Sequence, residues 1–366
     1  MPDPDTLFAR GPVPFRQFMA WALYDPEHGY YGANRAAIGR KGDFITSVSV
    51  GPLFGRLLGL QFREMWERLG QPAEFTIVEQ GANTGDFARD VLASLNDDAF
   101  ARAVRYVIIE PLAHNRARQA EALAPWPNVR WVESMEALAP FAGVHFSNEL
   151  LDAFPVHALK YENGRWHERY VTPDLQWTVG PFSDPALHNV LPHLPPVEGY
   201  ETEVNLEAPR WLEAILSKLD RGYLLVADYG FSRRDYYLPE RGTGTLTGYS
   251  AHRRCDNVLE APGERDITAH VEFTSLAERA EALGATLAGF TDQHHFMVGL
   301  GKEAFPDATA PLTPEEQRER RAFASLMHPA LMGRGFQYFA VAKNAPTPLA
   351  GFAFGGNPRA ALGLDG

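Results

Sequence analysis

Apolar positions follow a helical period early in the chain. Between Pro52 and Gly70 they recur at three- and four-residue spacing, with proline and glycine as start and stop signals. The apolar face of this predicted helix consists of Phe54, Leu57, Leu58, Phe62, Met65 and Leu69. A helix with one apolar face is expected to pack against a larger layer.

Short apolar runs then alternate with helical patterns. The runs are typical of buried strands and span residues 75–78, 104–109, 129–132 and 143–147. Helices are expected after the first run, with Phe87, Val91 and Leu95 on one side, and at 112–123. This order predicts an α/β fold with a mostly parallel sheet covered by helices on both faces.

The pattern changes after Pro155. Residues 156–161 and 165–171 predict a hairpin around Asn163-Gly164, and proline-rich sequence follows, so we interpret 156–205 as an insertion. Helix and strand signals resume at 210–219 and 223–227, then at 274–284, 314–328 and 335–342. The polar, glycine-rich stretch 230–270 is expected to be either functional or disordered, and the tail 345–366 to be loosely held.

Composition narrows the class of protein. The 366 residues are 45% hydrophobic and 12% aromatic, which permits a large core and argues against disorder. The net charge of −12 makes nucleic acid a poor default partner, because an acidic chain repels phosphate. With one cysteine, no membrane-spanning apolar run and no signal-peptide pattern, we expect a soluble, cytoplasmic protein without membrane association.

A glycine turn follows the first predicted strand, in Glu79-Gln-Gly-Ala-Asn-Thr-Gly-Asp86. Gly81 and Gly85 allow a sharp bend and a close approach of a ligand to the backbone. The second strand ends at Glu110, which lies 25 residues after Gly85. A carboxylate at that point can accept hydrogen bonds from two ribose hydroxyls, so the pattern indicates a nucleotide-like cofactor.

Two details favour S-adenosylmethionine over a dinucleotide. Glu79 would suit the methionine amino group and would repel a pyrophosphate. The middle position of the turn is Asn83 rather than glycine, which weakens the match to the dinucleotide pattern G-x-G-x-x-G. A nicotinamide-dependent oxidoreductase remains an alternative, as does a glycine turn that serves packing alone.

Acidic residues follow the fourth strand. Asn148, Glu149 and Asp152 lie after the carboxyl end of that strand, where open α/β sheets bind their ligands. A carboxylate there suits a planar guanidinium, which presents paired donors. Asp228, at the end of the fifth expected core strand, is a second candidate. The structural alternative is that Asp152 caps a turn and that Glu149 is merely exposed.

The N-terminal aromatic residues and a pair of histidines are weaker candidates for a functional site. Among the N-terminal aromatics, Tyr30 and Tyr31 follow a glycine and are better site candidates than Phe15, Phe18 or Trp21, which are expected to be packing residues. His294-His295 are expected to follow a strand, where adjacent side chains point to opposite faces. We therefore expect no metal.

Several strings together resemble the MidA-type methyltransferases, a family that includes the mitochondrial complex I assembly factor that methylates a protein arginine. The most specific string is Ser147-Asn-Glu-Leu-Leu-Asp-Ala-Phe-Pro-Val-His157. Besides the glycine turn, the others are Phe18-Met-Ala-Trp-Ala-Leu-Tyr-Asp-Pro-Glu-His-Gly-Tyr-Tyr31, Lys41-Gly-Asp-Phe-Ile-Thr-Ser47, Ile109-Glu-Pro111, Ala227-Asp-Tyr-Gly230, Thr243-Gly-Thr-Leu246 and Pro262-Gly-Glu-Arg-Asp-Ile-Thr-Ala-His270. Their order and spacing extend over nearly the whole chain.

The resemblance implies a class I methyltransferase core, with a Rossmann-like sheet of seven strands, the last antiparallel. The expected organisation is an N-terminal segment at 1–70 that covers the cofactor, a core at 71–155 and 206–344, and a substrate-facing lid at 230–270. S-adenosyl-L-methionine is the implied cofactor. The expected contacts are Asp43, Phe44, Thr46, Glu79, Gly81, Asn83, Gly85, Glu110, Pro111, Ser134, Met135 and Asn148.

Two positions depart from the family pattern. Asn83 stands where a third glycine is usual, and asparagine tolerates left-handed backbone angles. Val48-Ser49 stand where Pro-Glu is usual, which leaves the substrate open. The resemblance implies methyl transfer to a protein nitrogen, with Glu149 holding an arginine and Asn148, Asp152 and Asp228 nearby, and a respiratory-complex subunit as a possible partner. A non-catalytic assembly factor with the same fold is the alternative.

Overall fold

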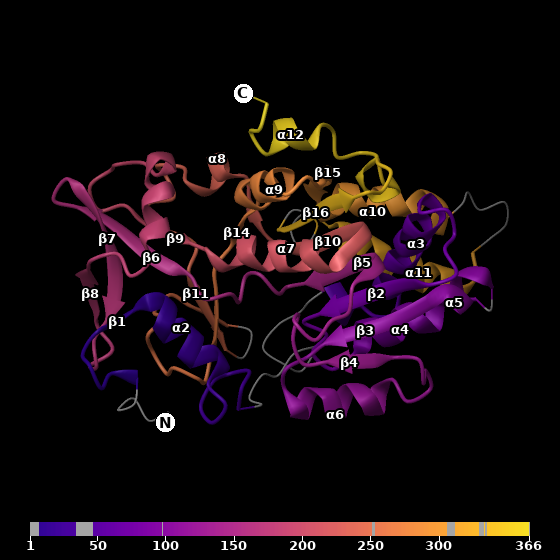
Figure 1. Cartoon of the computed structure of the whole chain (residues 1–366), viewed down its shortest axis with the longest axis horizontal. Coiled ribbons are helices and arrows are strands. Elements are labelled where there is room, and N and C mark those ends of the chain that lie inside the picture. Colours follow the sequence, from indigo (N-terminus) through magenta and orange to yellow (C-terminus); the bar gives the residue numbers. More distant parts are fainter. Residues whose placement is uncertain are drawn as a thin grey trace. The chain divides into compact units, whose positions relative to one another are not determined.

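The computed structural model describes residues 7–33, 47–96, 98–250, 253–305, 312–328, 333 and 335–365 (Figure 1). The chain forms two compact units. Unit 1 comprises Met1–Ile45, Leu151–Trp211 and Phe231–Ser275. Unit 2 comprises Thr46–Leu150, Leu212–Gly230 and Leu276–Gly366.

Unit 2 is organised around a mixed sheet whose hydrogen-bonded path runs β15-β16-β10-β5-β2-β3-β4. The strands on this path are β2 (Phe75–Gln80), β3 (Val104–Ile109), β4 (Arg130–Val132), β5 (Phe141–Asn148), β10 (Leu219–Phe231), β15 (Thr286–Asp292) and β16 (Phe336–Lys343). From β10 to β4 neighbouring strands are parallel, whereas β16 is antiparallel to both β10 and β15. The predicted α/β class with a mostly parallel sheet is therefore confirmed.

The strand count differs from the simplest expectation. The sheet has eight strands among the described residues, because the two-residue β14 (Val271–Glu272) lies off the path. The seven strands that the resemblance implies thus describe the path alone.

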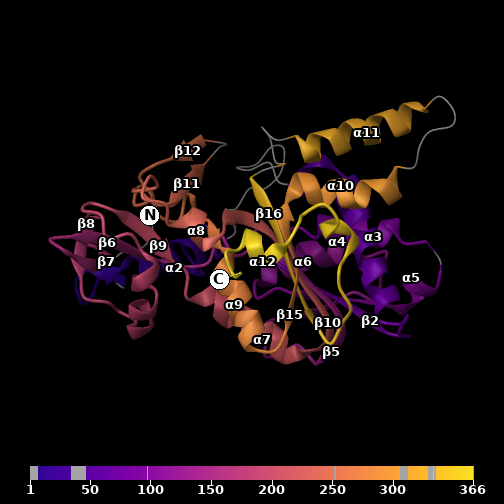
Figure 2. The same ribbon diagram turned by 90° about the horizontal axis from the view of Figure 1, so that it is seen from above.

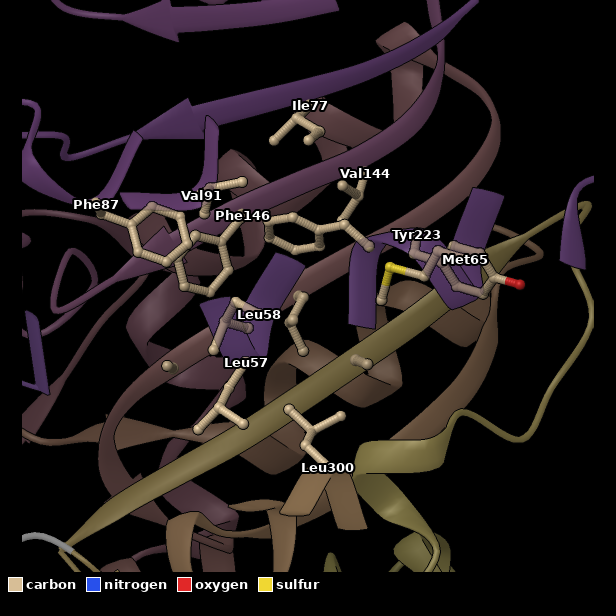
Figure 3. Close-up of a cluster of buried hydrophobic side chains, with 14 of the residues drawn as sticks. Leu57, Leu58, Met65, Ile77, Phe87, Val91, Val144, Phe146, Tyr223 and Leu300 are labelled. Carbon is tan, nitrogen blue, oxygen red and sulfur yellow. The ribbon is translucent and has the colours of Figure 1, made fainter. Parts of the chain in front are cut away.

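Helices in unit 2 bury their apolar faces in one cluster. The predicted helix after Pro52 is α3 (Leu53–Arg68), and its predicted face is buried throughout. Figure 3 shows side chains of α3 and α4 (Asp86–Ser94) meeting Ile77 of β2 and Phe146 of β5, with Phe146 stacked on Phe87 at 4.6 Å between ring centroids. Full burial of each Leu or Phe side chain contributes about 1.5–3 kcal/mol to the stability of the fold. This cluster therefore stabilises the packing of α3 and α4 against the sheet that carries the site.

The other helices with residues in unit 2 are α5 (Ala99–Ala103), α6 (Ala113–Ala122), α7 (Glu207–Lys218), α9 (Phe273–Ala282), α10 (Gln293–Ala304), α11 (Pro314–Met327), α12 (Pro358–Ala361) and the 3-10 turns η1 (Ser47–Val50) and η5 (Ala350–Phe352). Figure 2 shows α11 running alongside α10. A capping box at Thr313 and Glu316 begins α11, where both side chains bond to the first turn.

The tail after residue 344 corrects an expectation. Leu349 and Phe352 are buried in the main cluster of unit 2, and the backbone N–H groups of Ala350 and Gly351 donate to Glu64 and Gln61 of α3 at 2.8 and 3.0 Å. A loosely held tail does not hold for 345–365, because its apolar residues fill space beside α3.

Unit 1 contains the predicted hairpin. Its larger sheet runs β1-β7-β6-β9, with β8 paired to β7, and its strands are β1 (Val13–Pro14), β6 (His157–Glu162), β7 (Arg165–Val171), β8 (Trp177–Gly180) and β9 (Glu201–Val204). Asn163 and Gly164 both have positive φ angles, as a tight hairpin turn requires. Further 3-10 turns are η2 (Pro185–Asn189) and η3 (Leu191–His193).

The described residues of the stretch 230–270 form several short elements. It contains α8 (Arg233–Tyr236) and a three-stranded sheet in the order β12-β11-β13, made of β11 (Thr247–Ser250), β12 (Arg253–Cys255) and β13 (Asp266–Thr268). Strands of three or four residues are too short to show an alternating pattern. For this reason no strand could be predicted here from the pattern of apolar residues.

The N-terminal segment is divided between the units. α2 (Phe15–Tyr24) belongs to unit 1 and buries Phe15 and Phe18 completely, so their interpretation as packing residues is confirmed. α3 belongs instead to unit 2. Residues 1–70 are thus not one element, because the apolar face of α3 packs into the sheet core of unit 2.

Candidate functional site

The carboxyl ends of three adjacent strands of unit 2 form one edge of the sheet (Figure 1). In the strand registers Gln80 of β2 pairs with Ser147 of β5 on one side and with Ile109 of β3 on the other. The glycine turn, Glu110 and the Asn148–Leu150 segment follow directly after these strands. The structure therefore brings together the three groups of residues predicted for the cofactor.

The glycine turn has a left-handed backbone at three positions. The φ angles are 84° at Gly81, 44° at Asn83 and 84° at Gly85, which is the N-cap of α4. Asparagine thus adopts the conformation expected of it at the position that departs from the family. A Cβ atom added to the exposed Gly81 would lie 3.4 Å from the Leu150 side chain, in ordinary van der Waals contact, so the positive φ angle is what favours glycine there.

Glu79 is a buried acid at the end of β2. Its Oε2 accepts a hydrogen bond of 2.7 Å from the Tyr106 hydroxyl of β3. Burial raises the pKa of Glu79 to about 7, although the bond from Tyr106 opposes this shift. Glu79 is therefore poised to be ionised by a nearby cation at neutral pH.

Glu110 is held by several donors. Its Oε1 accepts from the Leu112 N–H at 3.0 Å, and its Oε2 accepts from Asn115 Nδ2 at 3.3 Å and Gln119 Nε2 at 3.0 Å. These bonds fix the carboxylate at the end of β3, only 5% exposed. A carboxylate offers about four acceptor positions, of which these donors fill three, so capacity for about one hydroxyl donor remains.

A strained turn follows β5. Glu149 has a φ angle of 51°, its N–H donates to the Ala227 carbonyl at 2.9 Å, and the next N–H, of Leu150, donates to Asp228 Oδ2 at 3.1 Å. Asn148 Nδ2 donates to Glu149 Oε1 at 2.9 Å. The turn thus aims an amide and a carboxylate from a backbone that neighbouring strand β10 holds in place.

Two polar atoms beside this turn are buried without a hydrogen-bond partner among the described residues. They are Asn148 Oδ1 and Ser147 Oγ. A buried acceptor left unpaired is destabilising by about 1–3 kcal/mol. These atoms are therefore candidates to bind a donor of the cofactor, such as an amino or hydroxyl group.

Asp228 and Asp152 lie in different units. Asp228 lies inside β10, fully buried, and its Oδ1 also accepts from the Tyr229 N–H at 2.8 Å, so it supports the turn through the backbone. Asp152 belongs to unit 1, where it is buried and its carbonyl accepts from the Ala269 N–H at 2.9 Å.

The two tyrosines of unit 1 that were site candidates have different surroundings. Tyr30 is a core residue, 1% exposed. Tyr31 stacks on Tyr24 and donates to Asp266 Oδ2 at 2.9 Å. Burial raises the pKa of Tyr31 well above its ordinary value, and the charge of Asp266 adds to this shift. Tyr31 therefore stays a neutral donor at physiological pH.

Some of the remaining residues predicted to contact the cofactor lie at the same end of the sheet, and others are not described by the structure. Pro111 is exposed after β3, and Ser134 and Met135 are half-buried after β4, at the same edge of the sheet. Asp43, Phe44 and Thr46 lie outside the residues that the structure describes.

His294 and His295 follow strand β15, as expected, but they lie in the first turn of α10, which the Asp292 side chain caps. Their rings bond separately, His294 to the Met327 carbonyl and His295 to Asp292. Within the described ranges no group of three His, Cys, Asp or Glu residues is arranged to hold a metal ion.

Two supporting residues were missed by sequence reasoning. Tyr106 lies within an apolar strand run, and Gln119 occupies a fully buried position in α6. Gln119 is seven residues after Leu112 and four before Leu123, so it falls on the inward face of the predicted helix. A polar residue at such a position is the signal that could have identified it.

The edge suits a cationic, nucleoside-containing ligand. Glu79, Glu110 and Glu149 make it acidic, which would repel a pyrophosphate and attract a sulfonium or an ammonium group. The unpaired Asn148 Oδ1 and the exposed Gly81 backbone leave room for polar contacts. These residues fit S-adenosylmethionine better than a nicotinamide dinucleotide.

Comparison with known proteins agrees with this geometry. Residues 57–291 match the family model described as "Putative S-adenosyl-L-methionine-dependent methyltransferase". A crystal structure of a protein from Burkholderia thailandensis bound to S-adenosyl-homocysteine superposes with a TM-score of 0.83 at 29% identity, over 97% of this chain and 98% of that one.

Curated relatives are named as protein arginine methyltransferases. The mitochondrial NDUFAF7 homolog of Drosophila melanogaster is 29% identical over 92% of this chain and 82% of its own length. The human mitochondrial protein arginine methyltransferase NDUFAF7 is 27% identical, over 90% of this chain and 80% of its own.

These names contradict the expected cytoplasmic location, because the relatives are mitochondrial. A missing secretory pattern and a single cysteine do not distinguish the cytoplasm from an organelle, so the expectation lacked a sufficient basis. No helix in the part of the chain that the structure describes is both long and apolar enough to cross a membrane.

Proposed function

Because the chain belongs to the S-adenosyl-L-methionine-dependent methyltransferase family that its residues 57–291 match, we propose that it methylates an arginine side chain of a partner protein. The arginine acceptor rests on the names of relatives that are 25–29% identical and on the chemistry of the site.

The observation that carries this proposal is the turn after β5. Glu149 is not glycine, yet it has a φ angle of 51°. Such backbone strain is destabilising by about 1–3 kcal/mol and concentrates at functional sites. Here the bonds to Ala227 and Asp228 hold the strain in place. The turn gives Glu149 a defined direction at the carboxyl edge of the sheet.

The proposed role of the residues on the cofactor side is to bind and orient S-adenosylmethionine. With the cofactor bound, Glu110 would accept from a ribose hydroxyl, the ionised Glu79 would attract the ammonium group, and Asn148 Oδ1 would accept from a donor group of the cofactor. Bound S-adenosylmethionine supplies an electrophilic methyl group on a sulfonium. Positioning of this kind accounts for much of the rate in a direct displacement.

On the acceptor side Glu149 pairs with the guanidinium. A carboxylate matches two N–H donors of arginine in one plane. Methylation would require the acceptor nitrogen to lose a proton, and Glu149 would accept it. Asp228 keeps this carboxylate in place through the Leu150 N–H.

The test separates transfer from cofactor binding. Cell lysate is incubated with radiolabelled S-adenosylmethionine and the protein, and the labelled band is identified by mass spectrometry. With that substrate, Glu149→Gln should lower methyl transfer by about 100-fold or more and change the Kd for S-adenosyl-homocysteine less than threefold. Full transfer by this variant, or a label on a residue other than arginine, would exclude the proposed role.

A non-catalytic binding factor is the second candidate, favoured by Val48-Ser49, which differ from the family's usual Pro-Glu. These residues lie in η1 (Ser47–Val50). Calorimetry with S-adenosylmethionine discriminates, since absence of binding at millimolar concentration would favour this candidate over the enzyme.

A further inference from the structure

Gln119 of α6 connects two parts of the proposed cofactor site. Its Nε2 donates to the Asn83 carbonyl of the glycine turn at 2.8 Å and to Glu110 Oε2 at 3.0 Å. The side chain is completely buried. We infer that Gln119 is a positioning residue that sets the ribose-binding carboxylate relative to the glycine turn; this inference rests on the proposed contact between Glu110 and the ribose.

The orientation of the Gln119 amide is determined by Trp131 of β4. The Trp131 Nε1–H group donates to Gln119 Oε1 at 2.9 Å. An indole N–H can only donate, so the oxygen of the amide must face Trp131 and the NH2 group must face Asn83 and Glu110. Figure 1 shows α6 alongside β4, the arrangement that allows this contact. The amide therefore acts as a donor toward the site.

Gly85 of the turn lies beside this side chain. A Cβ atom at Gly85 would lie 3.4 Å from Gln119 Cγ and 3.5 Å from its Cα, which is ordinary van der Waals contact. The φ angle of 84° is therefore what favours glycine here, and the turn packs directly against Gln119. The second glycine of the turn and Gln119 form one structural unit.

The bonds leave one oxygen of Glu110 better placed for a ligand. Oε2 accepts from two side chains, Asn115 and Gln119, whereas the Leu112 N–H is the only donor to Oε1 among the residues that the structure describes. With about two acceptor positions on each oxygen, Oε1 keeps one for a ribose hydroxyl. Without the Gln119 donor the carboxylate loses its link to the turn and can rotate away from that direction.

The test compares two ligands and a matched control. Calorimetry measures the Kd for S-adenosyl-homocysteine and for its 2′,3′-dideoxy analogue, which lacks the ribose hydroxyls. Gln119→Met keeps the volume and removes the donors. It should weaken binding of S-adenosyl-homocysteine about 10–30-fold and binding of the dideoxy analogue less than threefold. The ligand difference is a readout that a packing role would not produce.

Gln61 of α3 provides the control, because it is also completely buried and hydrogen-bonded at both ends of its amide. Gln61→Met should lower the melting temperature and leave both Kd values unchanged. Trp131→Phe offers a milder second variant that frees the Gln119 amide without replacing it, and should weaken S-adenosyl-homocysteine binding about threefold. It keeps the inference testable if Gln119→Met does not fold.

Glu110→Gln distinguishes the possible failures. If it weakens S-adenosyl-homocysteine selectively but Gln119→Met does not, the positioning role is overturned and the ribose contact stands. If Glu110→Gln affects both ligands equally or neither, the proposed ribose contact fails and the inference fails with it. Equal weakening of both ligands by Gln119→Met also overturns the positioning role.

Discussion

Units 1 and 2 assemble their polar clusters in different ways. In unit 2 the proposed cofactor residues follow the ends of β2, β3 and β5, strands that neighbour one another in the sheet. In unit 1 Tyr31 bonds to Asp266 across 235 positions of sequence. The difference teaches that a parallel sheet gathers polar residues at the ends of its strands, which the sequence can predict, whereas the polar contact in unit 1 joins residues far apart in the sequence that only the tertiary structure brings together.

Their buried carboxylates differ in the same way. Glu110 of unit 2 keeps an acceptor position at the sheet edge. Glu203 of unit 1 accepts from the Thr245 N–H at 2.8 Å, from its hydroxyl at 3.0 Å and from Tyr236 at 3.3 Å. A Cβ atom at Gly244 would lie 2.0 Å from Glu203 Oε1. The string Thr243-Gly-Thr-Leu246 thus marks a structural contact within unit 1.

The sharpest test of this comparison is Gly85→Val in unit 2. Valine is strained at a φ angle of 84° and would press on Gln119, so the turn must move. We expect the Kd for S-adenosyl-homocysteine to rise at least about 100-fold by calorimetry, with the far-ultraviolet circular dichroism preserved. Gly164→Val is the matched control, since it has a φ angle of 76° in the open hairpin turn of unit 1. Equal effects of both variants would break the comparison.

The corresponding test in unit 1 is Gly244→Ala. The added Cβ displaces the Glu203 carboxylate from its donors, which leaves a buried acid poorly paired. We expect the free energy of unfolding to fall by about 2–4 kcal/mol, while the Kd for S-adenosyl-homocysteine changes less than threefold. Gly199→Ala, with a φ angle of 80° and open space around it, should be much milder. A large loss of cofactor affinity would show that the two units do not act separately.

The smallest effect concerns pH. Because the pKa of Glu79 is raised to about 7, its carboxyl group is mostly protonated at pH 6 in the protein without ligand. A bound ammonium group favours the ionised form, so the Kd for S-adenosyl-homocysteine should be about tenfold higher at pH 6 than at pH 8. Glu79→Gln should have a higher Kd at pH 8 and no such slope. If the Kd of the Glu79→Gln variant still depended on pH, a group other than Glu79 would be responsible for the pH dependence.

Folding stability should change in the opposite direction. A pKa raised in the folded state gives stability that is present below the unfolded value of about 4.5 and is lost as pH rises through about 7. Glu79→Gln should therefore stabilise the protein at pH 8, as thermal unfolding can measure. Equal melting temperatures at pH 8 would mean that burial of the Glu79 charge is fully compensated.

The sequence predicted the edge of unit 2 well, because the strand runs and the residues that follow them are local features. It predicted the positive φ of Asn83 but not that of Glu149, since no glycine marks the turn after β5. The role of Gln119 depends on the packing of α6 beside β4, which no local pattern contains. The unit boundaries were missed for a similar reason, as Val13 of β1 pairs with Val171 of β7.

The position of β16 also has a consequence for biosynthesis. It lies between β10 and β15 and pairs with both, although it is made after either of them. During translation, β15 therefore waits without its sheet neighbour until residues 336–343 have emerged, and the edge of β10 stays open. A chain interrupted before Phe336 would expose both unpaired edges, making such a fragment a ready substrate for chaperones and for aggregation.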